Sequence, residues 1–554
     1  MNRFYRLLAY GYLPKELPPL FTSRAFACAI YAEKNPDALA GKKWQRASQY
    51  LLQQKPHYKR RLDVLCPHAM IKQAHLISEN YAQLSKAFTH VDGNCSCPAF
   101  NRKTKFQRAV RPYAIGIGYT KRKLTLRSRF PLILKLDVKN YYRSVYTHSI
   151  PWAIHGKKYA KTHIKKNILG NLLDRAVQQG QDGQTIGIST GPDTSFIISE
   201  ILLCRIIDEL VKRRSIRADR FVRYYDDIEY GCETEEEAYR VLTAFEDALR
   251  SYELETNPEK VQILSGPKQL ESPWLVRLRD LEWGKEIKAD RLLEVFSAVA
   301  EIAEQYPEDQ VYRYFLRSMR TCLVHETAWP VFEKILLAIF QDNRGDAKEV
   351  YQQFLLYRYL GCRINTKAVR EAIERKIAGQ LRRGVTSELS WAVYGYMTLG
   401  LRPTKDIIRR VFERGDVPSR VLAAKLAADT GISFRAEVAE CVREWDTDVL
   451  NSPEWLLAYE VMIHEWQRKG VRVPLPPENG TLYELLADKN VSFLDDSALE
   501  TIEVPSAFRK AKAEKEPDTV EPDAPEIMDF IAHDEVEKDT ADEKVADASD
   551  SGSE

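Results

Sequence analysis

The sequence lacks long apolar runs: no stretch of about 18 residues, the length that spans a bilayer, occurs among its 554 residues. The amino terminus, MNRFYRLLAYGYL, lacks the uninterrupted apolar core of a secretory leader. The nine cysteines are odd in number and scattered, which does not fit a disulfide framework. We therefore expect a soluble, cytoplasmic protein with reduced cysteines and no membrane partner.

Acidic residues are outnumbered by basic ones in most of the chain and are concentrated at its end. From Lys510 onward, 16 acidic residues accompany 5 basic ones, so this segment carries a net charge of −11 and the preceding residues carry +14. The segment is poor in aromatics and rich in Pro, Ser and acid, a composition that cannot bury enough surface to fold alone. Residues 509–554 are therefore predicted to be a disordered acidic tail. It either solubilises the protein or acts as an anionic mimic that competes for the basic body.

The pattern of apolar residues changes near residue 286. Residues 1–285 mix helical stretches with alternating strands and Gly-bearing turns, which is typical of an α+β domain. Residues 286–508 have apolar residues at helical spacing and almost no strand signal. Three segments there look alike, and their residues Trp391, Val421 and Trp455 are spaced 30 and 34 positions apart. This favours a solenoid of helix pairs, with an ordinary helical bundle as the alternative.

The segment FVRYYDDIEYG, residues 221–231, places two adjacent carboxylates inside an aromatic and β-branched run. Its flanks read as two strands, which leaves a two-residue turn at Tyr225 and Asp226. Neither residue is Gly or Asn, so a primed turn would hold a non-glycine residue at positive φ. Buried carboxylates need a cation, and the pair Asp226 and Asp227 favours a divalent metal.

A third acid follows another predicted strand. In PLILKLDVKNYY the apolar run 132–136 delivers Asp137 to the end of a strand. If this strand pairs beside the hairpin, three carboxylates from two elements converge. Such a set can bind two Mg²⁺ ions about 4 Å apart, which activate a 3′-hydroxyl and stabilise the leaving pyrophosphate. Without this third acid, the pair Asp226 and Asp227 would be typical of a solvent-exposed turn.

Two further motifs lie between and after these acids. The segment GISTGPDTS carries Gly187 and Gly191 around a polar loop, whose small side chains let the backbone approach a nucleotide or its templating base. The segment ETNPEKVQIL places Lys260 before a short strand. A lysine there could donate a proton to pyrophosphate or neutralise phosphate charge. The alternative is an ordinary surface lysine.

Residues 101–130 hold ten Lys and Arg, interleaved with aromatics, and no acid. Such a segment suits contact with the phosphates of a nucleic-acid backbone or of a triphosphate. Arg111, Lys123 and Arg127 are the predicted contacts. A solvated basic face is the alternative.

The order and spacing of these motifs resemble the fingers and palm of reverse transcriptases, over roughly residues 100–265. LKLDVKNYY looks like their first palm motif, GISTGPDTS like the Gly-containing second, YYDD like the aromatic-x-Asp-Asp hairpin and ETNPEKVQIL like the Asn-Pro-x-Lys motif. The resemblance implies an RNA-directed DNA polymerase that uses two Mg²⁺ ions, deoxynucleoside triphosphates and an RNA template to make DNA. It implies three sets of site residues: catalytic Asp137, Asp226, Asp227 and Lys260; metal-binding Asp137, Val138 through its carbonyl, Asp226 and Asp227; substrate-binding Tyr142, Thr190, Gly191, Arg111, Lys123 and Arg127.

Two of these positions bear on the substrate. Tyr142 falls where the family carries an aromatic that would crowd a ribose 2′-hydroxyl, which favours a deoxynucleotide. Thr190 departs from the Gln that many reverse transcriptases have there, which leaves the handling of the template and the incoming base open.

The opening LLAYGYLPKELPPLFTSRAFA and the helical carboxyl-terminal part with its WLLAYE segment resemble the abortive-infection and related defence-associated reverse transcriptases of bacteria. The resemblance implies reverse transcriptase fingers and palm with an amino-terminal helical extension over residues 1–285. An all-α, HEAT-like helical-repeat domain over residues 286–508 would stand in place of a thumb. The implied role is antiviral DNA synthesis, on a partner noncoding RNA or without a conventional template or primer. No maturase, endonuclease or integrase segment is recognised, which argues against a mobile element.

Other functions stay open beside this one. The same fold could serve as a template-independent polymerase, or as a protein-primed one in which a tyrosine hydroxyl replaces the primer end. From another class, the chain could be a nucleic-acid-binding scaffold with a vestigial palm. A homo-oligomer is also left open. The pair Cys95 and Cys97, with His90 nearby, could form half of a zinc site, but no second pair follows at suitable spacing, so a reduced loop is favoured.

Overall fold

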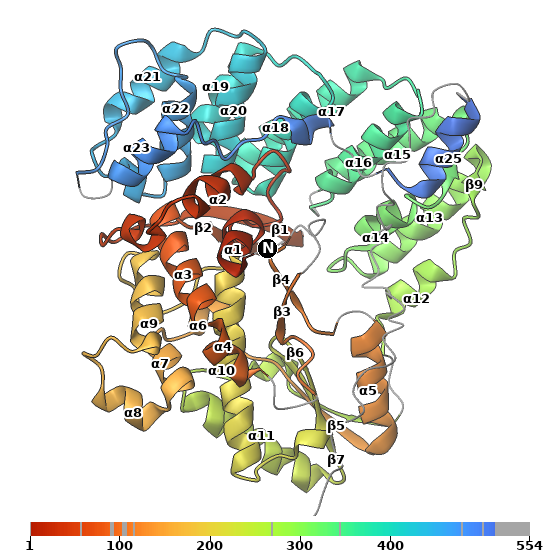
Figure 1. Cartoon of the computed structure of the whole chain (residues 1–554). Helices are drawn as coiled ribbons and strands as arrows, with labels where there is room; N and C mark the ends of the chain where they lie inside the picture. Colours follow the sequence, from red (N-terminus) through yellow and green to blue (C-terminus); the bar gives the residue numbers. More distant parts are fainter. Residues whose placement is uncertain are drawn as a thin grey trace, which may run out of the picture.

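The computed structural model describes residues 2–55, 58–88, 93–101, 108–114, 117–266, 270–342, 345–477, 480–500 and 504–515. Its amino-terminal half mixes helices with strands and its carboxyl-terminal part is largely helical (Figure 1), which confirms the predicted α+β class. None of the helices in these ranges combines the length and the apolar character that a membrane crossing requires.

A four-stranded antiparallel sheet lies in the amino-terminal half, in the strand order β6-β7-β5-β8. The strands are β5 (Leu132–Leu136), β6 (Phe221–Tyr224), β7 (Asp227–Cys232) and β8 (Gln262–Ser265). Leu136 pairs with Ile228, so the next positions in this antiparallel register, Asp137 and Asp227, lie opposite each other. The strand of Asp137 therefore pairs beside the β6–β7 hairpin, as the sequence predicted.

Helices cover both faces of this sheet because side chains alternate along each strand. On one face Ile133 and Val222 pack with Leu126 and Phe130, which belong to α5 (Ile117–Arg129) and its carboxyl-terminal end. On the other face Leu134 and its neighbours join the main apolar core. That face lies against α11 (Glu235–Arg250), and α11 in turn contacts the buried helix α10 (Asp193–Lys212).

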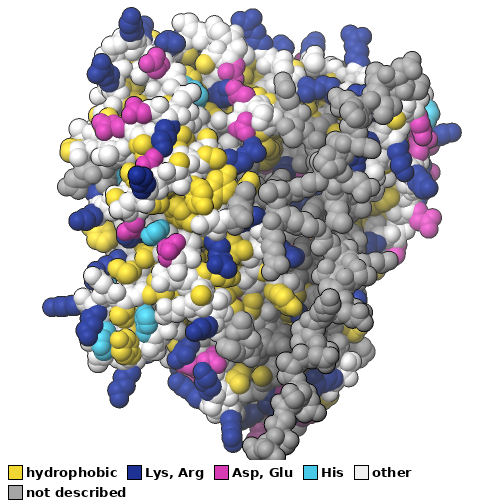
Figure 2. Space-filling view, viewed as in Figure 1, with side chains coloured by type: hydrophobic (Ala, Val, Ile, Leu, Met, Phe, Trp, Pro, Cys, Tyr) yellow, Lys and Arg dark blue, Asp and Glu magenta, His cyan; other side chains and the backbone are white. Residues whose placement is uncertain are grey.

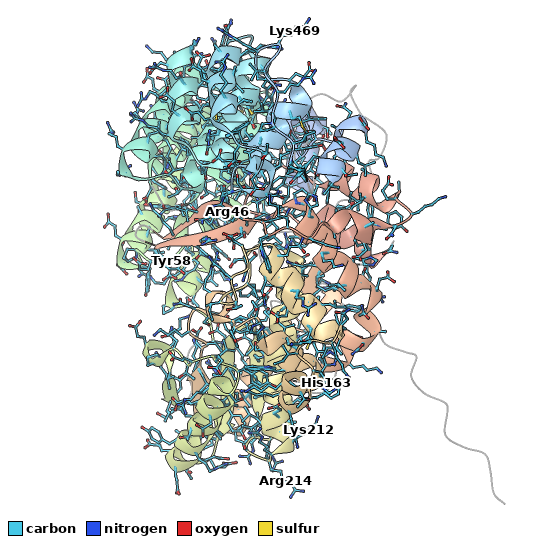
Figure 3. All side chains as sticks on the ribbon, turned by 90° about the vertical axis from the view of Figure 1, so that its left-hand side faces the viewer. Arg46, Tyr58, His163, Lys212, Arg214 and Lys469 are labelled. Atoms are coloured by element: carbon cyan, nitrogen blue, oxygen red, sulfur yellow. The ribbon has the colours of Figure 1, made fainter. Side chains whose placement is uncertain are left out.

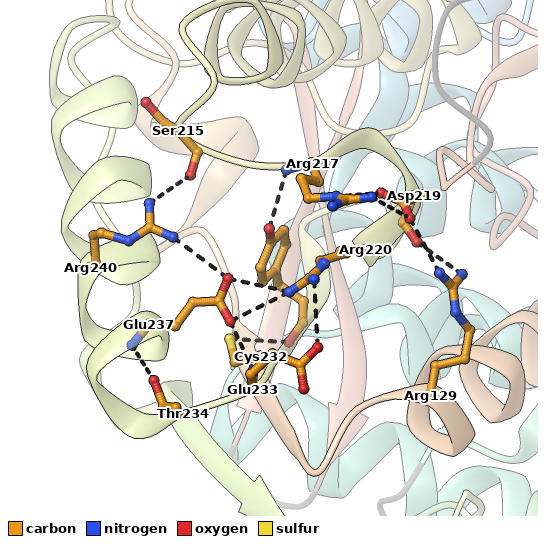
Figure 4. Close-up of polar contacts among 11 residues, drawn as sticks. Arg129, Ser215, Arg217, Asp219, Arg220, Cys232, Glu233, Thr234, Glu237 and Arg240 are labelled. Carbon is orange, nitrogen blue, oxygen red and sulfur yellow. Dashed lines mark hydrogen bonds and ion pairs between the residues drawn. The ribbon is translucent and has the colours of Figure 1, made fainter.

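The ends of β6 and β7 away from the acidic turn are fixed by polar contacts (Figure 4). Arg220, just before β6, lies 3.3 Å from Glu237 of α11 and 3.5 Å from Glu233. Thr234 caps α11 by accepting a hydrogen bond from the Glu237 N–H at 3.1 Å, and Asp219 pairs with Arg129 of α5 at 3.2 Å. The two strands are thus anchored at one end, and the acid-bearing turn projects from the other.

Most of the rest of the amino-terminal half lies to the left of the sheet and above it in Figure 1. Its strands form two separate hairpins, β1 with β2 and β3 with β4, and in the helical region the short strands β9 and β10 pair with each other. The elements of this half are α1 (Arg3–Tyr10), α2 (Arg24–Tyr31), β1 (Ser48–Lys55), β2 (Tyr58–Val64), α3 (Pro67–Glu79), α4 (Tyr81–Leu84), β3 (Pro98–Phe100), β4 (Val110–Pro112), α6 (Tyr141–Ser144), α7 (Ser149–His155), α8 (Lys157–Thr162), α9 (Leu169–Gln179) and α12 (Pro273–Arg279). The two short strands that follow it are β9 (Glu286–Ile287) and β10 (Leu323–Val324).

The helical region is built from stacked helix pairs. Helices α13, α15, α17 and α19 contact one another in succession, and α14, α16, α18, α20 and α22 form a second layer in the same way. Trp391, Val421 and Trp455 lie buried in α18, α20 and α22, so the three similar segments occupy equivalent places. This favours the solenoid over the bundle. The helices are α13 (Ala289–Gln305), α14 (Val311–Ser318), α15 (Trp329–Gln341), α16 (Ala347–Tyr359), α17 (Thr366–Arg383), α18 (Ser387–Thr398), α19 (Lys405–Arg414), α20 (Val417–Asp429), α21 (Arg435–Glu444), α22 (Trp455–His464), α23 (Gly480–Asp488), α24 (Ser497–Glu500) and α25 (Ser506–Lys515).

The second layer of helices docks on the amino-terminal half. The indole N–H of Trp391 donates to the carbonyl of Glu16 at 3.1 Å, and that of Trp455 to the carbonyl of Val64 at 3.1 Å. One apolar core runs through both parts. Lys and Arg side chains are spread over the face shown in Figure 2, with fewer acidic side chains among them, in keeping with a basic body.

Two details differ from the sequence-based boundaries. The region predicted to be all-α contains the two short strands β9 and β10, which pair in parallel; two-residue strands are too short to give an alternating pattern. The tail was predicted to begin at 509, yet α25 continues to Lys515, and Phe508 is buried against Tyr357 at a ring distance of 5.4 Å. The tail prediction therefore applies to residues 516–554, which lie outside the described residues.

Candidate active site

The turn between β6 and β7 has the predicted geometry. Tyr224 pairs with Asp227, which leaves Tyr225 and Asp226 as the two-residue turn. Tyr225 has φ of +54°, a conformation that is strained for a bulky residue. The predicted positive φ at a non-glycine turn residue is confirmed.

Buried polar groups hold this strained residue by its backbone. The N–H of Tyr225 donates to Ser96 Oγ at 2.9 Å, and its carbonyl accepts from Arg223 Nη1 at 2.8 Å. Arg223 also forms an ion pair with Glu200 of α10 at 2.6 Å, and both side chains are at most 1% exposed. Ser96 Oγ in turn donates to Glu200 at 3.2 Å. Sequence reasoning missed this support, although a glutamate within the apolar helix α10 was a signal.

The three predicted acids meet at one end of the sheet. Asp137 is buried, and its carboxylate accepts from Lys260 Nζ at 2.8 Å. Burial, with the negative charges of Asp137 and Asp227, raises the pKa of Asp226 to about 6. Burial chiefly raises the pKa of Asp227 too, with Asp137 adding to it and Lys135 opposing it. The carboxylates are therefore close enough to repel one another.

This set of donors fits divalent metal ions. It offers oxygen ligands alone, which Mg²⁺ prefers, and the pKa values of Asp226 and Asp227 stay raised although lysines lie nearby. Lys260 is 57% exposed, so its side chain is free to swing away from Asp137. Val138 is buried beside these acids and bridges to Thr256, and its carbonyl as a ligand stays a prediction.

The structure places the predicted nucleotide-binding loop beside these acids. The N–H of Ile188 donates to the carbonyl of Tyr142 at 2.7 Å, which ties loop 187–191 to α6. The Tyr142 hydroxyl accepts from Ser199 Oγ at 3.2 Å, so its ring is held in position. Gly191 has φ of +134°, and a Cβ there would lie 2.9 Å from Pro14, so only glycine fits.

Thr190 is held by an acid that sequence reasoning missed. Its N–H donates to Asp63 Oδ2 at 3.0 Å, and the Asp63 N–H donates to the carbonyl of Thr190 at 2.8 Å. Asp63 lies on β2, 127 positions away along the chain. The sequence around Asp63 did not indicate this contact, because an aspartate among basic strand residues is typical of a solvent-exposed surface.

The three residues predicted to contact phosphate have different surroundings. Arg111 is exposed on β4 and available to a ligand. Arg127 and Lys123 instead pair with the buried Glu229 of β7, at 2.7 and 3.0 Å. These two cations therefore fasten α5 to the sheet, although Lys123 also lowers the pKa of Asp227. The basic composition of residues 101–130 could not reveal an acid from a distant strand.

In the cysteine region Cys95 and Cys97 are free, which agrees with the favoured prediction of a reduced loop. His90 lies outside the described residues. Ligand atoms of Cys97, Glu200 and Cys204 lie within 4.8 Å of one another, so the partner of Cys97 comes from α10. Arg223 Nη2 already donates to Cys204 at 3.4 Å and to Glu200 at 2.6 Å, which disfavours a cation there. In the described ranges all cysteines are free.

Comparison with known families agrees with this geometry. The family model for reverse transcriptase (RNA-dependent DNA polymerase) matches residues 76–289. That segment includes the three acids and Lys260 and excludes the β1–β2 hairpin. None of the curated proteins compared with the chain matches it. The chain therefore carries a reverse transcriptase domain at residues 76–289, which implies RNA-directed DNA polymerase activity.

Proposed function

We propose that the protein makes DNA by two-metal phosphoryl transfer, with Asp137, Asp226 and Asp227 as the metal ligands. The observation that carries this proposal is the convergence of Asp137, at the end of β5, with the two acids of the β6–β7 hairpin. When bound, two Mg²⁺ ions would activate the primer 3′-hydroxyl and neutralise charge on the leaving pyrophosphate. The buried Arg223–Glu200 pair keeps the hairpin in one geometry, as positioning requires.

Lys260 would act on the leaving group. Its pKa is raised, first by the hydrogen bond to Asp137, so the ammonium stays protonated. Because the side chain is largely exposed, it can reach a phosphate when cations occupy the carboxylates. There it would donate a proton or stabilise negative charge.

Tyr142 would select deoxynucleotides. The hydrogen bond from Ser199 fixes the phenol, and loop 187–191 closes the other side through the Tyr142 carbonyl. A ribose 2′-hydroxyl would meet the ring. We expect Tyr142→Ala to admit ribonucleotides about ten times better or more, as measured by competition between labelled ribo- and deoxynucleotides; unchanged discrimination would contradict this role.

We further propose a role in antiviral defence, in the cytoplasm, with a HEAT-like repeat domain and a dedicated noncoding RNA as template. The resemblance of the amino-terminal opening and of the helical region to defence-associated reverse transcriptases supports it, together with the stacked helix pairs. Sequencing the nucleic acid that copurifies with the wild-type protein and with a variant lacking the acids would report template and product.

DNA synthesis on primed RNA with Mg²⁺ tests the enzymatic proposal. Asp226→Asn together with Asp227→Asn should lower incorporation by at least about a thousandfold and leave the fold intact, because only metal ligation is lost. Retained synthesis would contradict the proposal. If the same double variant still protected cells against phage, a scaffold with a vestigial palm would be favoured instead. DNA covalently attached to the purified protein would indicate protein priming.

A further inference from the structure

The β1–β2 hairpin lies outside the matched domain, yet it forms part of the wall of the active site. Asp63, near the base of β2, is 1% exposed and bonds the backbone of Thr190 in both directions. It also accepts from Arg143 Nη2 at 2.8 Å and from Arg61 Nε at 2.9 Å. Arg143 directly follows Tyr142. The hairpin is thus joined to both segments that flank the nucleotide position.

The outer part of β2 carries cations without acidic partners. Four consecutive residues, Tyr58 to Arg61, are exposed, whereas the next three are buried. Arg61 pairs with Asp63, but Lys59 and Arg60 form no ion pair within the part of the chain that the structure describes. Exposed cations left unpaired in this way suit an anionic ligand.

Arg60 lies on the side of the nucleotide position. Burial raises the pKa of the Tyr142 phenol, and the charge of Arg60 is one of the groups that lower it. The charge of Asp226 acts on the same phenol in the opposite direction. Arg143 Nη2, which follows Tyr142 in the chain, donates to the carbonyl of Arg61 at 3.1 Å, so the backbone next to Arg60 lies beside the predicted nucleotide position.

The helical region holds the hairpin from its other side. The N–H of Gln53 donates to Ser387 Oγ at 3.1 Å, and Gln310 Nε2 donates to the carbonyl of Gln54 at 3.1 Å. Tyr50 shares a hydrogen bond with Ser390 at 2.9 Å. Figure 3 shows the hairpin, marked by Arg46 and Tyr58, between the helical region and the sheet-containing half. Its cations are therefore presented on a fixed support.

We propose that Lys59 and Arg60 bind backbone phosphates of the nucleic-acid strand that lies beside loop 187–191. The hairpin would then complete the template-binding cleft from outside the reverse transcriptase domain. The inference rests on the proposed polymerase function. Each cation would neutralise about one phosphate and release its counterions, so binding would depend on salt and not on base sequence. The triphosphate of an incoming nucleotide offers the same chemistry and is the competing source.

The test uses the full chain with Lys59→Ala and Arg60→Ala combined. Binding of poly(rA) primed with oligo(dT) is followed by fluorescence anisotropy over a series of salt concentrations. We expect the Kd to rise about tenfold at low salt and the slope of log K against log salt to fall by about 1 to 2. The KM for the deoxynucleoside triphosphate should stay within about twofold.

The matched control removes the same two charges elsewhere. Lys212→Ala with Arg214→Ala changes the end of α10, far from the hairpin in Figure 3, and should leave the Kd and the slope unchanged. Equal thermal unfolding midpoints would show that both variants fold. Repeating the binding series in the Asp226→Asn, Asp227→Asn background separates this inference from catalysis, because binding needs no chemistry. An unchanged Kd and slope would overturn the inference, and so would a raised KM for the triphosphate with unchanged nucleic-acid binding.

Discussion

The acid Glu388 of the helical region and the two acids of the catalytic turn have opposite surroundings. In the helical region Glu388 forms an ion pair with Lys376 at 2.9 Å, with both side chains 2% exposed. At the catalytic turn Asp226 and Asp227 form no ion pair within the described ranges, and their pKa values are raised. A buried acid with a paired cation is compensated in the fold, whereas acids left to repel one another reduce stability and keep a site ready for cations. The comparison therefore predicts that Glu388 has a structural role and that Asp226 and Asp227 have a functional one.

The largest expected effect comes from breaking the pair in the helical region. Lys376→Ala would leave Glu388 buried without its cation and lower the free energy of unfolding by about 3–5 kcal/mol. Denaturant unfolding measures this loss. Lys376→Met with Glu388→Gln removes both charges and should cost less. A loss below about 1 kcal/mol for Lys376→Ala would show that the pair is not structural.

Substitution of Lys260 tests the functional role of the charges at the catalytic site. Lys260→Ala should lower kcat about 10- to 100-fold, because a proton donor or charge at the leaving group is lost, while the KM changes little. Single-turnover incorporation measures the chemical step. Lys158→Ala, on the exposed helix α8, is the control and should behave as wild type. An equal rise in KM with unchanged kcat would assign Lys260 to substrate binding instead.

Relief of repulsion should be visible at the catalytic turn itself. In metal-free protein at pH 8, Asp226→Asn should raise the free energy of unfolding by about 1–2 kcal/mol, because the ionised group is disfavoured in the fold. Asp219→Asn is the control at the far end of β6. The pKa of Asp219 is lowered by its hydrogen bond with Arg217, so this change should not stabilise the protein. If Asp226→Asn lowered the free energy of unfolding, the claim that repulsion at the catalytic turn destabilises the fold would be wrong.

The smallest expected effect is the pH dependence of stability due to Asp346, a buried acid of the helical region whose negative charge is only partly neutralised by Arg313. Burial raises the pKa of Asp346 to about 7, although Arg313 lies 3.4 Å away. Between about pH 4 and pH 7 the folded state holds a proton that the unfolded state has released, so stability falls as the pH rises through this window. In Asp346→Asn the free energy of unfolding should fall by about 1 kcal/mol less between pH 4 and pH 7 than in the wild type, as measured by unfolding curves at a series of pH values. An unchanged slope would show that Asp346 ionises normally.

Local features of the site could be predicted from the sequence. The turn at Tyr225 and Asp226 followed from the lengths of its flanking strands, and Asp137 followed from the apolar run before it. These inferences succeed because strand alternation and turn length are set by neighbouring residues.

The supporting contacts could not be predicted, because they join distant parts of the chain. Glu200 and Ser96 are 104 positions apart, and Asp63 meets Thr190 across 127. The same limitation hid the partner of Arg127, because Glu229 lies 102 positions away on another element. Composition indicates that a segment is basic, but only tertiary packing decides whether its charges face a ligand or a buried acid.

The indole contacts of Trp391 and Trp455 bear on how the chain can be divided. Both rings belong to the helical region and end on carbonyls of the first 64 residues, inside one shared apolar core. A fragment limited to residues 76–289 would lose the Asp63 contact to Thr190 and expose apolar surface that the helices now cover. The shared core therefore extends beyond residues 76–289 on both sides. A fragment intended to fold and work as a polymerase should include residues from both flanking parts.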